Sequence, residues 1–442
     1  MKSDKSNLTR LNLIFRALHS RNYRLFFSGQ SISLIGTWIT RTATSWLVYR
    51  LTGSAFLLGV VGFAGQIPTF LLTPIAGVLV DRWDRHRILI ITQVLSMAQS
   101  FALAALTMSG VVAVWHIIVL SILQGLVNAF DMPARQSFVI EMVENKEDLG
   151  NAIALNSSMV NGARLMGPSI AGVLIAIAGE GICFLIDGIS YLAVIGSLLA
   201  MRVAPKEIGP RGTDIIDGLK EGFNYALGFA PTRAILFLLA LVSLMGMPYM
   251  VLMPIFASDV LHGGPHTLGF LMAASGIGAL TGSIYLASRE TVRGLGKIIA
   301  LASAIFGIGL IGFSLSRVFW LSMLLVLIVG FGMMVQMASS NTILQTIADE
   351  DKRGRLMSFY TMALIGMAPF GSLLAGGLAS KVGAPNTLII GGVFCILGSV
   401  LFTKRLPDLR KIVRPIYVKM GIIPEVAEGI QRAAELTIPP EN

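Results

Sequence analysis

Twelve long apolar segments constrain what this chain can fold into more than any other feature of its sequence. The hydrocarbon core of a bilayer is about 30 Å thick, and a helix needs about 20 apolar residues to cross it. The segments lie near residues 25–49, 56–80, 88–109, 111–134, 152–178, 181–201, 234–257, 268–288, 297–315, 319–347, 356–379 and 386–403. The sequence therefore predicts an all-α polytopic membrane protein with twelve transmembrane helices.

The composition agrees with a membrane-embedded chain and excludes several other classes. Hydrophobic residues make up 54% of the sequence and charged residues only 13%, where a soluble chain carries about a quarter charged residues. The two cysteines, Cys183 and Cys395, begin apolar segments in opposite halves and offer no disulfide framework. A soluble enzyme, a disordered protein and a disulfide-rich secreted scaffold are all excluded.

Sequence motifs of the common phosphate-, metal- and serine-dependent chemistries are absent. The sequence contains no GxxxxGK[ST] loop, no HExxH pair and no GxSxG turn. We therefore expect that the chain is not an enzyme and that it holds no metal or cofactor.

The basic residues are distributed unevenly between alternate loops. If the N-terminus is cytoplasmic, most of the 34 lysines and arginines lie on the cytoplasmic side, and only Arg50, Arg317 and Lys381 lie on the opposite side. Because basic loops stay on the cytoplasmic side, this pattern predicts a protein of the inner (cytoplasmic) membrane with both termini cytoplasmic. Charge spread over membrane-proximal loops favours contact with the lipid bilayer over binding of nucleic acid, which requires one basic patch.

A polar stretch with three prolines, residues 202–233, divides the chain into two halves. We expect it to be a cytoplasmic linker between an N-terminal six-helix bundle, residues 25–201, and a C-terminal one, residues 234–403. Residues 1–24 and 404–442 are then cytoplasmic tails.

The two halves share a weak internal repeat. Three glycines of the first half recur in the second at one constant separation, as the pairs Gly150 and Gly354, Gly167 and Gly371, and Gly172 and Gly376. Parallel repeats with a substrate site at their interface are a transporter architecture. The repeat therefore favours a transporter over a rigid membrane enzyme.

The second cytoplasmic loop carries the most specific motif, in which Gly77 is followed by Asp81 four residues on and then by a basic run with Arg82 and Arg85. This stretch resembles the loop motif of the major facilitator superfamily, with Asp84 in place of the usual glycine, and the resemblance covers the chain to about residue 405. It implies that Gly77, Asp81, Arg82 and Arg85 latch the two halves in the outward-facing state. Asp81 stands where the next helix is expected to begin, so it can cap that helix.

The fifth apolar segment contains Gly167, Pro168 and Gly172 in a pattern similar to the antiporter motif of the same superfamily. Small residues let helices approach closely, and a proline bends its helix. The resemblance implies export in exchange for an ion, which we expect to be a proton. The stretches 22–53 and 128–136 resemble the transmembrane secretion effector branch, which includes enterobactin-exporter-like proteins.

Four ionisable residues lie inside the predicted spans: Arg41, Asp131, Arg164 and Asp187. Burial of a charge in a membrane costs about 2.5–3.5 kcal/mol, so each is a candidate for binding substrate or for coupling. Arg41 and Asp187 lie at similar depth on helices that are neighbours in facilitator-like bundles, so the resemblance implies that they can pair. Asp131 has Arg135 one turn on. Arg164 lies near mid-membrane with no acidic residue within a turn, and its guanidinium suits an anionic group of the cargo.

Three functions fit these features. The first is an ion-gradient-driven exporter of small organic molecules, siderophore- or drug-like and with an anionic group. The second is a metabolite importer with the same fold, and the third is a membrane scaffold or assembly factor without transport. The amphipathic stretch 424–436 either lies on the membrane or binds a partner helix.

Overall fold

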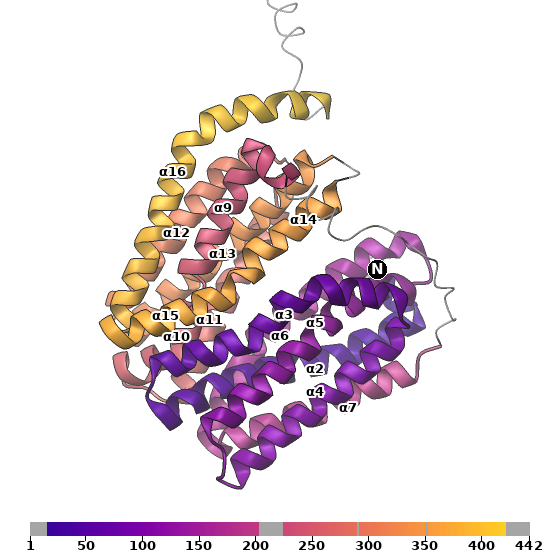
Figure 1. Ribbon diagram of the computed structural model, residues 1–442, viewed down its shortest axis with the longest axis vertical. Coiled ribbons are helices and arrows are strands. Elements are labelled where there is room, and N and C mark those ends of the chain that lie inside the picture. Colours follow the sequence, from indigo (N-terminus) through magenta and orange to yellow (C-terminus); the bar gives the residue numbers. More distant parts are fainter. Residues whose placement is uncertain (1–15, 203–223, 290, 350–351, 421–442) are drawn as a thin grey trace, which may run out of the picture.

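The computed structural model describes residues 16–202, 224–289, 291–349 and 352–420, and helices dominate these segments (Figure 1). The N-terminal half comprises η1 (Arg16–His19), α2 (Arg21–Thr52), α3 (Ala55–Arg82), α4 (Arg85–Met108), α5 (Val114–Met142), η2 (Lys146–Asp148), α6 (Leu149–Ala178) and α7 (Glu180–Leu199). The C-terminal half comprises α9 (Ala230–Met245), α10 (Tyr249–Ile255), η3 (Phe256–Val260), α11 (Pro265–Ala287), α12 (Leu295–Leu315), α13 (Phe319–Ile347), α14 (Arg353–Thr361), η4 (Met362–Gly366), α15 (Ala368–Val382) and α16 (Ala384–Lys419).

Eleven segments of the described chain are long and apolar enough to cross a bilayer, which makes this a multi-pass membrane protein. The predicted count of twelve is not confirmed, because the first apolar run forms α2, which does not qualify. Its length is sufficient, but polar side chains lower its hydropathy. Gln30, Ser33 and Thr42 are buried in the protein, so they do not meet lipid.

Two of the spans are interrupted, which the sequence analysis did not anticipate. The seventh is divided into α9, a turn at residues 246–248, α10 and the π-helical η3. The eleventh is divided by the π-helical η4, just before Pro369 at the start of α15. Proline removes a backbone donor, and π-helical turns occur often at functional sites.

The last helix is longer than the predicted span at residues 386–403. α16 continues to Lys419 with Pro407 and Pro415 inside it, so the first part of the predicted C-terminal tail is helical. The first helix also begins earlier than the predicted span at residues 25–49, since α2 begins at Arg21. The amphipathic stretch 424–436 and most of the predicted linker lie outside the described residues.

The helices pack as two groups (Figure 1). In the first, α2 packs on α6 and α7, α3 on α5, and α4 on α5 and α7; in the second, α13 packs on α11 and α12, and α16 on α9 and α12. The groups meet mainly through α3 with α15 and α6 with α11. We call the surface where α2 begins and α16 ends the tail face, and the opposite surface the far face.

The repeated glycines occupy matching positions in the two groups. Gly150 and Gly354 both have open space where a Cβ would stand. A Cβ on Gly167 would clash with the Trp38 Cβ on α2, and one on Gly371 would lie 2.6 Å from the Leu244 carbonyl oxygen on α9. Each therefore packs against the first spanning helix of its own half, as an internal repeat requires.

Close glycine contacts join the two groups near the far face. A Cβ on Gly172 would lie 3.1 Å from the Gly269 Cα, and a Cβ on Gly376 would lie 2.8 Å from the Gly59 Cα. Pro168, one turn before Gly172 on α6, presents its carbonyl oxygen to Gly269. We call the contacts of α6 with α11 and of α3 with α15 the glycine seams. The missing side chains let these backbones meet directly.

One hydrogen bond also joins the halves near the far face. The Tyr49 hydroxyl, near the end of α2, donates to the Asp259 carboxylate in η3. Toward the tail face, by contrast, Gly77 on α3 meets no atom within 4 Å of a Cβ position. The two groups diverge in that direction (Figure 1), so the structure is closed near the far face.

We predict that Gly376→Val opens the far-face contact of α3 with α15, because the added side chain would displace the Ala55 and Gly59 backbone. The adjacent Gly377→Val is the matched control, since a Cβ at Gly377 meets nothing within 4 Å. Distances between spin labels on the far-face ends of α3 and α15 should lengthen in the first variant only. Equal distances in both variants would show that the seam does not hold the halves closed.

We predict that Tyr49→Phe also shifts the population away from the far-face-closed state, because it removes the bond to Asp259. Tyr23→Phe is the control: Tyr23 donates to the Ala152 carbonyl oxygen at 2.7 Å within the N-terminal half. Each variant should lose about 1 kcal/mol of stability. Only Tyr49→Phe should increase amide hydrogen exchange at the far-face ends of α2 and η3, and the same increase in Tyr23→Phe would contradict the assignment.

Candidate functional site

A cavity of about 340 Å³ lies between the two helix groups. The N-terminal half contributes residues of α2, α3, α4, α5 and α7 to its wall, and the C-terminal half contributes residues of α10, α11, α15 and the turn at 246–248. Both interrupted spans therefore border it. A cavity at the interface of two repeats is where transporters hold their cargo.

The two walls of this cavity differ in chemistry. The N-terminal wall carries hydroxyl, amide and charged groups, which include Thr37, Arg41, Gln66, Gln99, Gln124, Asn128, Asp187 and Tyr191. The C-terminal wall is largely apolar, with Met247, Met250, Val251 and Met272. Methionine adapts its shape to different apolar groups. The cavity therefore suits an amphiphilic molecule with its polar end against the N-terminal half.

Among the described residues of the cavity wall, Arg41 is the one cation, and it lies beside Trp38. Its guanidinium carbon is 5.0 Å from the centre of the indole, and that of Arg164 on α6 is 5.8 Å from the same ring. Two cations thus share one aromatic partner: each gains a cation–π contact, while their like charges repel each other. Arg164 itself is not among the lining residues, so the expectation that it reaches the cargo directly is not met in this structure.

The expected ion pair between Arg41 and Asp187 is not formed within the described residues, although both line the cavity. The Asp187 carboxylate lies against α2, where a Cβ on Gly36 would be 2.7 Å from its Oδ1 atom. Oδ2 accepts from the Ser100 hydroxyl at 2.8 Å, and Oδ1 has no hydrogen-bond partner. A buried acceptor without a partner is uncommon, so Asp187 is suited to take up a proton.

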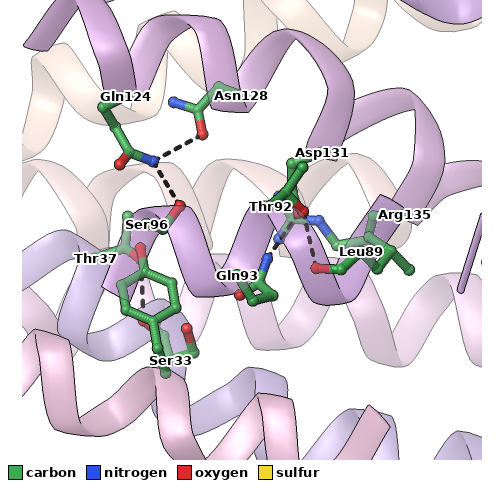
Figure 2. A network of polar contacts seen from close by, with 11 residues as sticks. Ser33, Thr37, Leu89, Thr92, Gln93, Ser96, Gln124, Asn128, Asp131 and Arg135 are labelled. Carbon is green, nitrogen blue, oxygen red and sulfur yellow. Dashed lines mark hydrogen bonds and ion pairs between the residues drawn. The ribbon is translucent and has the colours of Figure 1, made fainter. Parts of the chain in front are cut away.

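Asp131 is a fully satisfied carboxylate, in contrast to Asp187. It accepts from Thr92 at 3.1 Å and Gln93 at 2.7 Å on α4, and from Arg135 at 2.6 Å on its own helix (Figure 2). The predicted pair with Arg135 is thus confirmed. Since only 4% of Asp131 is exposed, these donors balance the cost of its burial and join α4 to α5.

A second group of polar contacts lies beside this one. The Gln124 side-chain amide on α5 donates to the Ser96 hydroxyl on α4 and to Asn128, each at 3.2 Å (Figure 2). Because Gln124 and Asn128 also line the cavity, the hydrogen bonds that fix them orient amide groups toward the cargo space.

The loop between α3 and α4 differs from expectation in its helix cap. Asp84, not Asp81, caps α4, because its carboxylate accepts from the backbone amides of His86 at 3.0 Å and Arg87 at 3.3 Å. The side chain of Asp81 lies outside the described set. Arg85 pairs with Glu141 on α5 at 2.6 Å, and Arg82 is exposed. Asp84 occupies the position of the usual glycine, so capping explains this departure from the motif.

Sequence reasoning missed Trp38 and the apolar wall. Trp38 has no charge to mark it inside a span, and its role depends on Arg164 from another helix. The C-terminal wall had a signal that was not used: the pair Gly246 and Pro248 interrupts an apolar run, as helix breaks at binding sites do.

Comparisons with known proteins agree with this geometry. The family model described as transmembrane secretion effector matches residues 14–415. The chain is 28% identical to the staphyloferrin A transporter of Staphylococcus aureus (strain NCTC 8325 / PS 47) over 86% of this chain and 95% of the relative. It is 30% identical to the multidrug efflux pump Tap of Mycolicibacterium fortuitum over 85% and 93% of the two chains.

Among solved structures, the fold resembles a bacterial homologue of the human lysosomal transporter Spinster, solved in an inward-facing and unoccupied conformation. The TM-score is 0.67 at 13% identity, over 86% of this chain and 96% of the other. The relatives and the solved structure named here are transporters. The chain therefore belongs to the transmembrane secretion effector family of major facilitator superfamily exporters.

Proposed function

We propose that this exporter carries small organic molecules with an anionic or strongly hydrogen-bond-accepting group, and that an ion gradient drives it. The observation that carries the proposal is Arg41, a cation in the wall of the inter-half cavity with no ion-pair partner among the described residues. Its planar guanidinium offers paired donors to a carboxylate or similar group. The apolar opposite wall accommodates the remainder of the molecule.

Export is favoured over the two alternative functions. One relative named above is a multidrug efflux pump, which supports outward movement over import of a metabolite. A scaffold would have no need of a cavity lined by a free arginine and a carboxylate. An anion that leaves the cell also moves with the membrane potential, which contributes about 2.3 kcal/mol per charge at 100 mV.

Alternating access of the two halves gives a role to the loop residues Gly77, Asp81, Arg82 and Arg85. With the topology expected from the charges, the tail face is cytoplasmic and this structure is an inward-open state. The open space at Gly77 fits a latch that engages only in the outward-facing state. Closing the tail face would bring other helices against Gly77, and opening the far face would part the glycine seams.

Arg41→Ala should lower transport of an anionic cargo at least tenfold, because a charge-assisted bidentate contact contributes about 1.5–3 kcal/mol. Uptake into inside-out proteoliposomes, measured for lipophilic carboxylic acids against their amides, tests this. Arg41→Lys should retain part of the preference for the acid. Arg164→Ala, which removes a cation outside the wall, should have a smaller effect. Equal loss of acid and amide transport in Arg41→Ala would refute the docking role.

We propose that the coupling ion is a proton carried by Asp187. Asp187→Asn should abolish the dependence of transport on an imposed pH gradient while binding of the acid persists, because the amide cannot exchange a proton. Asp131→Asn is the control, since that carboxylate is held by three donors and does not line the cavity. A full response to the pH gradient in Asp187→Asn would exclude this residue as the carrier.

A further inference from the structure

The extension of α16 beyond residue 403 is an amphipathic helix at the tail face. Leu406, Leu409 and Val413 are buried, and they recur at intervals that place them on one side of a helix. The segment also carries exposed basic residues, among them Arg405, Arg410 and Arg414. In Figure 1, α16 bends over the end of the C-terminal helix group, and an amphipathic helix of this composition is suited to the membrane–water interface.

A second cavity, of about 350 Å³, lies beneath this extension and apart from the cargo cavity. Its walls come from the start of α9, residues 292–296 at the start of α12, the end of α13, and α16. Most of the lining is apolar, with Ile235, Ile343, Phe402 and Leu409 among the side chains. No acidic residue is among the described lining residues. An apolar space of this size at the membrane surface would accept part of a hydrocarbon chain.

Three arginines complete the wall of this cavity: Arg293, Arg410 and Arg414. All three are exposed, and within the described chain none of their guanidinium groups makes a hydrogen bond or an ion pair. The nearby Asp408 is 3.5 Å from Lys411, so it does not neutralise them. The first turn of α12 adds backbone amides without helical partners. The rim of the apolar space is thus strongly cationic.

We propose that this cavity binds an anionic diacyl phospholipid from the tail-face leaflet. One acyl chain would enter the apolar space, and the phosphate would lie against Arg410, Arg414 and Arg293. Basic pockets between transmembrane helices on the cytoplasmic side are suited to anionic headgroups. A free phosphate would leave the apolar space unfilled, and a zwitterionic lipid would leave the positive charge uncompensated. The lipid would fasten α16 to α9 and α12.

The test uses the purified full chain in detergent with added phosphatidylglycerol or phosphatidylcholine. Native mass spectrometry counts the retained lipids, and thermal unfolding reports stabilisation, since a ligand of the folded state raises apparent stability. Phosphatidylglycerol should be retained preferentially and should raise the unfolding temperature more. The double variant Arg410→Gln/Arg414→Gln should bind it on the order of tenfold more weakly.

The matched control is Lys404→Gln/Arg405→Gln, which removes the same charge from the same helix outside the cavity lining. It should keep the preference for phosphatidylglycerol. Leu409→Trp should fill the apolar space and weaken binding with all arginines in place. The proposal is overturned if the wild type does not distinguish the two lipids, if the control loses the preference equally, or if glycerol phosphate alone stabilises as much as the lipid.

Discussion

The direct contact of backbones at the glycine seams is the interaction on which the rest of this structure depends. Within a bilayer no hydrophobic force draws helices together, so association rests on close packing. Gly172 against Gly269 and Gly376 against Gly59 allow that packing without side chains between the helices. In the part of the chain that the structure describes, no ion pair joins the two halves at these contacts. Two halves held in this way can separate at the far face and close at the tail face.

The glycine seams determine where the two chemically different walls of the cavity face each other. With the far-face ends fixed, the cavity lies where the walls diverge, and only groups that face it meet the cargo. The N-terminal wall holds its polar groups by hydrogen bonds within its own half, as Gln124 does with Ser96. The C-terminal wall gains its shape from breaks at Pro248 and before Pro369. A rigid polar wall and an adaptable apolar wall suit a family whose members carry varied molecules.

The sequence predicts local relations well and relations between helices poorly. The pair of Asp131 and Arg135 depends only on spacing along one helix, and the repeated glycines depend only on position in the chain, so both could be read directly. The pair of Arg41 with Asp187 also requires the rotation of two helices about their axes, which equal depth does not determine. Whether Arg164 reaches the cavity depends on the same rotation, and it is not among the residues that line the cavity in this structure. The cap at Asp84 rather than Asp81 shows that helix starts remain uncertain by a few residues.

α2, the predicted span whose hydropathy is too low to qualify, also shows that the direction in which each side of a helix faces determines its role. α2 places Thr37, Arg41 and Thr44 on the cavity and buries Gln30 and Ser33 between helices, so little of its surface must match lipid. A helix that faces water on one side and protein on others can afford a polar sequence, whereas a lipid-facing helix cannot. In this chain, weak hydropathy in a full-length helix coincides with a polar face on the cavity between the two halves. α2 thus has the length of a span, and its polar residues face the cavity and neighbouring helices, which explains why hydropathy alone does not count it among the spans.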